Sequence, residues 1–360
     1  MSTSNSTPTH VLEALQTALA HTAQKQGDDF YKPRPQQYWY HDDSKWKSIE
    51  KTPPPPQSTA NINPKALRLI SWNIDMLIGF ASPRMSAALT YLSTLVSSTP
   101  PSTPVIIFLQ EMTQADLVQI RDAKWVQERF YITDYDSRDW MGSLYGTTTL
   151  VDKMLKIETV FRVPWISKFG RDGLFVDIAL SPSAENLTAE KEVEQSVLRL
   201  CNTHLESLVA DPPIRPLQLS AAAPYLHDPK TSASLLAGDL NAIQPFDRTL
   251  HSENNLKDAY LELGGQEDSG DGYTWGYQVP QAVRERFGCS RMDKILFTGD
   301  VGVKGFERIG MGVKVVDEGV VKEMREKGED EWVTDHYGVM GDFELGGGRK
   351  EEIDVRSKLA

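Results

Sequence analysis

Gly238-Asp239-Leu240-Asn241 follows directly on the apolar run Ala233–Ala237, whose residues are Ala-Ser-Leu-Leu-Ala. Short apolar runs that end in an amide, a carboxylate or an imidazole recur along the chain. Runs of this kind, separated by polar, helical or turn-rich stretches, predict an α/β protein. The strand ends of an α/β sheet can meet at one rim, where sites are commonly built. The polar residues at these positions are Asn73, Glu111, His204, Asp239, Asp293 and the pair Asp335-His336.

Composition limits the kind of protein that this sequence can encode. The 360 residues are 40% hydrophobic and 24% charged, which is typical of a soluble globular protein with one large α/β domain or two ordinary ones. A net charge of −12 argues against broad electrostatic binding to nucleic acid or anionic lipid. A phosphate substrate would therefore need a local positive charge, for example a metal ion.

Two features predict where the protein works. The sequence holds 2 cysteines, Cys201 and Cys289, so we expect neither a disulfide framework nor a cysteine zinc site, but a reducing compartment. No apolar run approaches the ~18 residues of a membrane span, and Met1–His10 lacks the features of a secretory signal. We expect no membrane insertion and an intracellular location, in the nucleus, the cytoplasm or both.

Three regions follow from the distribution of residues. Residues 1–60 form a flexible N-terminal segment with an aromatic cluster, and Pro53–Pro56 is a stiff linker that predicts a domain boundary near Ala60. The cluster either packs on the outside of the domain or binds a protein partner. Residues 61–346 are the expected catalytic domain, and residues 347–360 are a charged C-terminal tail. The aromatic cluster consists of Tyr31, Tyr38, Trp39, Tyr40 and Trp46.

The polar strand ends suit metal-assisted phosphate chemistry. Asparagine and carboxylate oxygens are the ligand class of Mg²⁺ or Mn²⁺. His204 and His336 could each act as a base, a ligand or a donor, and a carboxylate beside an imidazole would fix its tautomer. Each residue alone is more simply a strand-end cap, so the prediction rests on their combination. The chain contains neither a Gly-x-Ser-x-Gly elbow nor a phosphate-binding G-x-x-x-x-G-K-[ST] loop.

Six ordered motifs carry a family resemblance over about residues 65–346. The sequence resembles the endonuclease/exonuclease/phosphatase superfamily, and the wording of the first and third motifs, together with Tyr273–Trp275, is most similar to the 5′-tyrosyl-DNA phosphodiesterases. The motifs are Ser71–Asp75 (SWNID), Leu109–Glu111 (LQE), Thr203–Ser207 (THLES), Gly238–Asn241 (GDLN), Arg291–Ile295 (RMDKI) and Thr334–Gly338 (TDHYG).

The resemblance implies both a fold and a set of residue roles. The implied fold is a four-layer α/β sandwich, with two mixed β-sheets face to face, helices outside and the site in loops at one end. Mg²⁺, for which Mn²⁺ could substitute, would be held chiefly by Glu111, with Asn73 and Asp335 nearby. The remaining roles implied by the resemblance are water activation by Asp239, phosphate binding by Asn241 and His204, and stabilisation of developing charge by His336, which Asp293 orients.

Two positions depart from the subfamily. Where the phosphodiesterases carry arginines after the third and fourth motifs, this chain has Val209 and Ile243, which puts affinity for a long DNA strand in doubt. Arg215 could replace one of these arginines, although a surface helix position is the simpler interpretation. Tyr145 and Trp275, both in glycine-rich contexts, are candidate walls for a flat substrate group, with core packing as the alternative.

Three functional hypotheses remain open at this point. The first is a Mg²⁺-dependent phosphodiesterase that removes tyrosyl adducts from DNA 5′ ends in DNA repair. The second is another activity of the superfamily, namely an abasic-site endonuclease, an RNA deadenylase or an inositol or lipid phosphatase. The third is a catalytically silent binding module, which is disfavoured because each candidate position carries a competent residue type.

Overall fold

Two mixed β-sheets lie face to face in a computed structural model, which describes residues 30–49, 64–180 and 196–346. We call them sheet A and sheet B. The seven strands of sheet A follow the order β1 (Arg34–Pro35), β8 (Ile157–Pro164), β9 (Asp172–Leu180), β10 (Ser196–Thr203), β11 (Thr231–Asp239), β13 (Asp293–Gly299) and β12 (Lys257–Asp258). The eight strands of sheet B follow the order β14 (Val301–Ile309), β15 (Gly338–Leu345), β4 (Ala66–Asn73), β5 (Val105–Met112), β7 (Gly146–Asp152), β6 (Phe130–Ile132), β2 (Tyr38–His41) and β3 (Trp46–Ile49).

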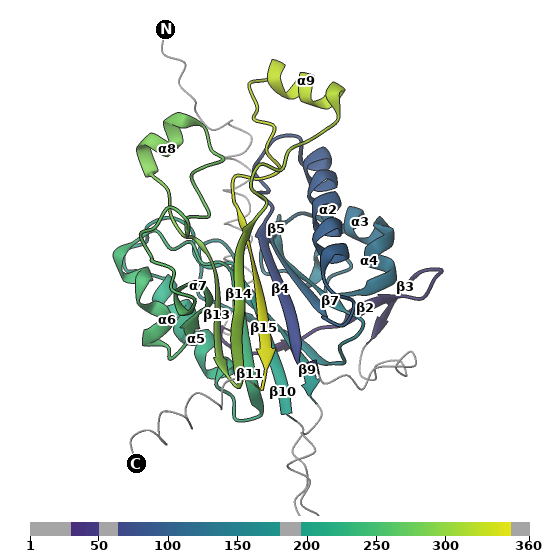
Figure 1. Cartoon of the computed structure of the whole chain (residues 1–360), viewed down its shortest axis with the longest axis vertical. Helices are drawn as coiled ribbons and strands as arrows, with labels where there is room; N and C mark the ends of the chain where they lie inside the picture. Colours follow the sequence, from purple (N-terminus) through teal and green to yellow (C-terminus); the bar gives the residue numbers. More distant parts are fainter. Residues whose placement is uncertain (1–29, 50–63, 181–195, 347–360) are drawn as a thin grey trace, which may run out of the picture.

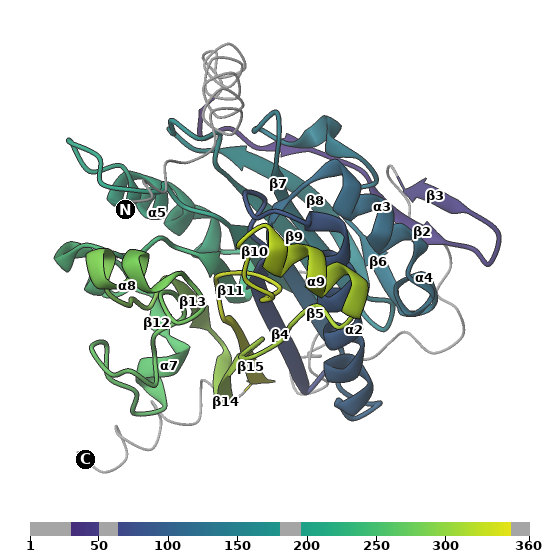
Figure 2. The same ribbon diagram turned by 90° about the horizontal axis from the view of Figure 1, so that it is seen from above.

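Helices cover the outer faces of both sheets (Figures 1 and 2). Sheet B is covered by α2 (Ala81–Ser98), α3 (Gln114–Asp122) and α4 (Lys124–Arg129). Sheet A is flanked by α5 (Arg215–Leu226), α6 (Leu250–Glu253) and α7 (Ala259–Glu262). The short helices α8 (Gln281–Phe287) and α9 (Glu318–Glu326) lie beyond the ends of the strands in Figure 1. The predicted four-layer α/β sandwich is therefore confirmed. Among the described residues, no helix combines the length and the apolar character that a membrane crossing requires.

The strands are apolar on both faces because both faces are covered. Side chains alternate between the faces of a strand. In β4, Leu67 and Leu69 accordingly lie in the core between the sheets, whereas Ile70 and Trp72 pack against the helices that cover sheet B. All four side chains are completely buried. The near-continuous apolar runs of the sequence thus reflect a central strand between two layers.

The N-terminal strands correct the boundary expected near Ala60. Arg34 and Pro35 pair with β8 at the edge of sheet A, and Trp39 in β2 pairs with Ile132 of β6 in sheet B. Tyr38 is buried in the core between the sheets. Residues 30–49 are thus built into both sheets, because their aromatic side chains complete cores that distant strands leave open. Pro53–Pro56 and the C-terminal tail lie outside the described residues.

The sheet topology brings the polar strand ends to one edge. β10 and β11 are parallel, as are β4 and β5, so the carboxyl ends of each pair lie side by side. β13 runs antiparallel to β11 and begins where β11 ends, which makes Asp239 and Asp293 register partners. At Gly238 a Cβ atom would lie 1.7 Å from the Thr203 carbonyl oxygen. Only glycine therefore permits the close approach of β10 and β11 beside Asp239.

Candidate active site

Asp239 lies at the centre of the site and is almost completely buried. Its Oδ2 atom accepts a hydrogen bond from Asn73 Nδ2 at 3.0 Å, and its Oδ1 atom accepts one from the backbone N–H of Asn241 at 2.8 Å. Oδ2 also lies 3.3 Å from His204 Nε2 and 3.8 Å from His336 Nε2. Burial by itself would raise the pKa of Asp239, but the two imidazoles and the hydrogen bonds hold the pKa below its usual range. Asp239 is thus an ionised acceptor between two histidines.

His204 is held as a neutral imidazole by its neighbours. Its Nδ1 atom lies 2.5 Å from Arg171 NH1, and because a guanidinium can only donate, Nδ1 must accept and the ring proton must be on Nε2. Burial and the charge of Arg171 lower the pKa of His204. The Nε2 atom is buried without a hydrogen-bond partner in the structure. His204 therefore presents a free N–H donor toward Asp239 and Glu111, where a ligand oxygen could accept it.

His336 has the opposite protonation state. Its Nδ1 atom lies 2.8 Å from Asp293 Oδ2, and its Nε2 atom faces Asp239 and Asp335. Burial would lower the pKa of His336, but these three carboxylates raise it well above its usual value. Burial raises the pKa of Asp293 to about 6, so the pair is charged at neutral pH. Trp72 donates from Nε1 to the backbone carbonyl of His336 at 3.1 Å, which fixes the ring at the end of β4.

Glu111 and Asn73 complete the neighbouring wall of the site. Glu111 has a φ of 56° at an irregularity in the pairing of β5 with β7, a conformation that non-glycine residues adopt at a cost. Its carboxylate lies 3.3 Å from Asn73 Nδ2 and accepts a hydrogen bond from the backbone N–H of Met76. The oxygen of the Asn73 side chain accepts from the backbone N–H of Asp75. Asn73 therefore bridges the carboxylates of Glu111 and Asp239 with its amide nitrogen.

The donor set of the site fits a divalent cation. Carboxylate oxygens of Glu111 and Asp239 lie within 4.8 Å of each other, beside the imidazole of His204. Burial raises the pKa of Asp335 and that of Asp75, and repulsion from neighbouring carboxylates, including Glu111, raises both further. A divalent cation bound among these groups would relieve that repulsion, and carboxylate oxygens are the ligands that hard cations prefer.

Two aromatic residues flank the site in different ways. Trp275 is half-buried and donates from Nε1 to Asp335 Oδ2 at 2.7 Å, so it holds this carboxylate in place. Tyr145 is largely buried, and the guanidinium of Arg171 lies 5.1 Å from the centre of its ring. Tyr145, Arg171 and His204 line one small cavity. Tyr145 and Trp275 thus both lie beside the candidate site, and each contacts a charged group there.

The sequence profile of the Endonuclease/Exonuclease/phosphatase family matches residues 70–336, a span that includes the first five motifs and ends within the sixth, at His336. The chain belongs to this family. As a member of the endonuclease/exonuclease/phosphatase family, it is a hydrolase that acts on phosphodiester bonds. Enzymes of the family generally depend on a divalent metal, in agreement with the acidic and histidine groups gathered here. No curated protein sequence matches the chain.

Solved structures share the family fold at low sequence identity. Truncated TDP2 of Caenorhabditis elegans is 22% identical, with a TM-score of 0.56 over 78% of this chain and 98% of that one. TDP2 of D. rerio, complexed with a single-strand DNA product, is 20% identical, with a TM-score of 0.55 over 78% of this chain and 99% of that one. The catalytic domain of human Nocturnin is 14% identical, with a TM-score of 0.50 over 78% and 95% of the two chains. The predicted superfamily and the resemblance to 5′-tyrosyl-DNA phosphodiesterases are confirmed at the level of the fold.

Arg215 does not contact the family's reaction site, which contradicts its expected role as a phosphate ligand. Its Nε and NH2 atoms donate to the carboxylate of Asp247 at 2.9 and 2.8 Å, and NH2 also donates to Gln244. NH1 donates to the backbone carbonyls of Glu206 and Leu208. All five N–H groups are used within the protein and the side chain is buried, so Arg215 supports two loops rather than a substrate.

Two residues of the candidate active site, Arg171 and Asp75, were not predicted from the sequence. Arg171 lies 33 positions before His204 in the sequence, but Gly173 in β9 is the register partner of Thr203 in β10, which places Arg171 beside the histidine. The available signal in the sequence was that Arg171 directly precedes β9, the strand before the one that ends in Thr203-His204. Asp75, within the first motif, has a φ of 56° and joins the acidic group around Glu111.

Proposed function

We propose that the chain is a Mg²⁺-dependent phosphodiesterase that removes tyrosyl adducts from DNA 5′ ends and so serves DNA repair. The observation that carries the catalytic part is the placement of Asp239 between a neutral His204 and a charged His336, next to the carboxylate of Glu111. The motif resemblance supports the substrate. The shared fold with a TDP2 that is complexed with a DNA product is in agreement with it.

Glu111 would be the chief ligand of Mg²⁺, for which Mn²⁺ could substitute, with Asp335 nearby. Bound there, the cation would stabilise the negative charge that develops on the phosphate oxygens during in-line attack. Asn73 would act through its amide nitrogen, which orients the carboxylates of Glu111 and Asp239. This role differs from the oxygen ligand expected for Asn73 and follows from the bond between its oxygen and the backbone of Asp75.

The chain's own residues would then orient water and phosphate. Asp239 has a lowered pKa and stays ionised, so it would accept a hydrogen bond from the attacking water. This bond would orient a lone pair of the water oxygen toward phosphorus. His204 would donate its Nε2 proton to a phosphate oxygen, with the side chain of Asn241 beside it. His336, charged by Asp293, would stabilise the charge of the transition state more than that of the ground state.

Tyr145 and Trp275 would contact the flat groups of the substrate. Arg171 lies against the rings of Tyr145 and Phe169, at 5.1 and 5.5 Å, and supplies positive charge near the phosphate in a chain with a net charge of −12. A base or a phenol stacked at such a wall typically contributes about 1–3 kcal/mol to binding. Aromatic contact and one phosphate would suffice for a 5′ end that carries a tyrosine.

A substrate panel tests the proposal. The purified full-length chain is incubated with 5′-phosphotyrosyl oligonucleotide, abasic duplex DNA, poly(A) RNA and inositol phosphates, each with Mg²⁺, with Mn²⁺ and with EDTA. We expect release of tyrosine with Mg²⁺ and no release with EDTA. No release at micromolar enzyme, together with cleavage of one of the other three substrates in the same buffer, would assign the chain to another activity of the family.

Glu111→Gln tests the metal assignment. A neutral amide cannot supply the charge that holds a hard dication, so turnover at sub-millimolar Mg²⁺ should be lost while the fold remains intact. Turnover is measured as a function of Mg²⁺ concentration and folding by circular dichroism. Glu128→Gln, an exposed glutamate in α4, is the matched control. Wild-type kcat in Glu111→Gln at low Mg²⁺ would mean that another group is the principal ligand.

A further inference from the structure

Exposed aliphatic side chains occur on loops that follow strands of sheet A next to the candidate site. They lie on three loops: the loop after β8, the loop after β10 that follows His204, and the loop after β11 that follows Asn241. We call them the aliphatic rim. The rim consists of Ile166 (40% exposed), Leu208 (66%), Val209 (67%) and Ile243 (38%).

Buried hydrogen bonds join the second and third loops of the rim. Arg215 donates to the carbonyl of Leu208 at 2.7 Å and forms a two-point ion pair with Asp247. Asp247 in turn accepts a hydrogen bond from the backbone N–H of Ile243 at 3.0 Å. A single buried ion pair therefore fixes the positions of Leu208 and Ile243 relative to each other.

The first loop is attached to the same framework. Gln218 in α5 donates to the carbonyl of Ile166 at 2.9 Å and accepts from the backbone N–H of Glu206 at 2.7 Å. The Glu206 carboxylate accepts from the backbone N–H of Lys168 at 2.9 Å. Glu206 and Leu208 are two and four residues beyond His204, so hydrogen bonds join all three loops close in the chain to this histidine.

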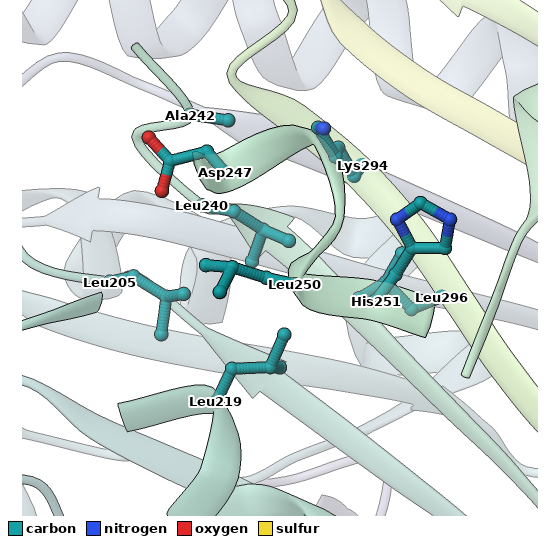
Figure 3. A pocket seen from close by; sticks show the side chains of 9 residues that line it. All are labelled: Leu205, Leu219, Leu240, Ala242, Asp247, Leu250, His251, Lys294 and Leu296. Atoms are coloured by element: carbon teal, nitrogen blue, oxygen red, sulfur yellow. The ribbon is translucent and has the colours of Figure 1, made fainter. Parts of the chain in front are cut away.

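The rim is not part of the packed core. The core beneath these loops is formed by other apolar side chains, and a small cavity there, shown in Figure 3, is lined mainly by leucines. The leucines of the motifs themselves, Leu205 and Leu240, point into it. Leu208, Val209 and Ile243 are thus free to contact a ligand. The cavity is lined by Leu205, Leu219, Leu240, Ala242, Asp247, Leu250, His251, Lys294 and Leu296.

The backbone at Leu208 gives an independent indication that its side chain has a function. Leu208 has a φ of 65°, in the left-handed region that favours glycine and asparagine and disfavours leucine. Neither local backbone preference nor core packing explains a leucine here. A contact made by the exposed side chain would explain it.

The charge of the rim is unsuited to a polyanion. Residues 207–214 and 240–247 contain no lysine or arginine, and residues 207–214 contain an acidic residue, Asp211. The loop that carries Ile166 has two basic side chains: Lys168, which is exposed, and Arg171, which is buried against His204 and Ser207. A chain of phosphates is bound by several cations along its path. One lysine beside four aliphatic side chains instead suits a single phosphate with an uncharged neighbour.

We infer that the aliphatic rim binds an uncharged, apolar group esterified to the scissile phosphate, and not a second phosphate. The inference rests on the proposed phosphodiesterase function and specifies its substrate class: phosphodiesters whose substituent on the His204 side is apolar. A tyrosyl-DNA substrate would then place the uncharged substituent of its scissile phosphate at this edge, with the remaining phosphates of the strand outside it.

A homologous series of 4-nitrophenyl alkyl phosphates tests the inference with the full-length chain and Mg²⁺. Hydrolysis of the methyl ester reports the proposed phosphodiesterase, whereas the change in kcat/KM from methyl to butyl to hexyl reports the rim. Complete burial of one methylene corresponds to about a fourfold gain. On a half-open surface we expect kcat/KM to rise about tenfold from methyl to hexyl.

Variants assign the gain to the rim. Leu208→Asn keeps a residue that tolerates the left-handed backbone, so it should fold at least as stably as the wild type while the gain from methyl to hexyl falls to about threefold or less. Leu208→Asn combined with Val209→Ser should abolish the gain and leave the methyl ester unaffected. Val316→Ser, at an aliphatic residue that is 87% exposed and outside the rim, is the control and should keep the whole gain.

Three results would overturn the inference. Equal kcat/KM for the three esters in the wild type, a full gain in the double variant, or a preference for a diester with a second phosphate would each do so. If the methyl ester is not hydrolysed, the proposed function fails, and calorimetric titration with methyl and hexyl phosphate still measures the rim. Tighter binding of hexyl phosphate by the wild type, lost in the double variant, would then support the inference.

Discussion

A histidine N–H donor lies on each side of Asp239, and the two donors are held by neighbours of opposite charge. On the β10 side, Arg171 keeps His204 neutral, so the donor N–H there is fixed by a cation. On the β13 side, Asp293 keeps His336 charged, so the donor there is fixed by an anion. The carboxylate of Asp239 can therefore orient both imidazoles, while its negative charge is offset by the charged imidazole alone. The residue type at a site position therefore does not determine its protonation state; the neighbour behind it does.

Removal of the shared acceptor should have the largest effect. Asp239→Asn eliminates the charge that both imidazoles face and, on the proposed mechanism, the group that orients water, so kcat should fall by about 10²–10⁴-fold with little change in KM. Steady-state kinetics on the tyrosyl oligonucleotide measure both constants. A variant with an increased KM and a wild-type kcat would assign Asp239 to binding.

Asp293→Asn tests the side of Asp239 on which His336 is charged. The amide can still accept a hydrogen bond, but it no longer supplies the charge that raises the pKa of His336, so we expect a loss in kcat of about 10²-fold. The pH profile separates this role from a structural one, because the alkaline limb of activity should move to lower pH. An unchanged profile with normal kcat would show that His336 does not depend on Asp293.

The neutral side is tested by Arg171→Met, which keeps much of the side-chain volume. Loss of the guanidinium removes both the donor to Nδ1 and the positive charge that lowers the pKa of His204, so the pKa should rise and the tautomer should no longer be fixed. NMR titration of the histidine rings follows this directly. Ser207→Ala, which removes the other partner of Arg171, is the matched control and should leave the ring titration nearly unchanged.

Aromatic contact and carboxylate positioning can be separated at Trp275. Trp275→Phe keeps a ring but loses the N–H that holds Asp335, whereas Trp275→Ala loses both. We expect the alanine variant to lower kcat/KM on the tyrosyl oligonucleotide by about ten- to hundredfold, as expected for loss of one stacked base. If phenylalanine restores only KM, the indole N–H contributes to the chemical step.

The smallest effect concerns the free energy of unfolding. Its dependence on pH should have opposite slopes for the two histidines. His336 has a raised pKa, so its contribution is complete below pH 6.5 and is lost as pH rises through the folded value. His204 has a lowered pKa, so the free energy of unfolding should decrease as pH falls below 6.5. Each slope is at most about 1.4 kcal/mol per pH unit. Urea unfolding in EDTA should show a flatter alkaline side in His336→Asn and a flatter acidic side in His204→Asn.

Local pattern predicted an α/β protein with polar residues at its strand ends, and the family resemblance supplied the four-layer sandwich and the expected residue roles. Apolar runs that end in polar residues indicate strands. Parallel pairing places Asn73 beside Glu111 in sheet B, and the packing of β11 of sheet A against β4 and β5 then brings Asp239 to them. The direction in which a long side chain points could not be predicted from local pattern. Whether an arginine faces a phosphate depends on a partner elsewhere in the chain, as Asp247 shows for Arg215. The same limit concealed Arg171, since its proximity to His204 depends on strand pairing across 33 positions.

The N-terminal strands also protect the molecule from self-association. β1 covers part of β8, and β2 with β3 extends sheet B beyond the three-residue strand β6. A chain that starts at Ala60 would leave the apolar strand Ile157–Pro164 as an open edge, with unpaired N–H and C=O groups available to a second molecule. Such a truncated protein could retain every catalytic group and still form aggregates. Residues 30–49 thus cover part of one edge strand of sheet A and add two strands to sheet B.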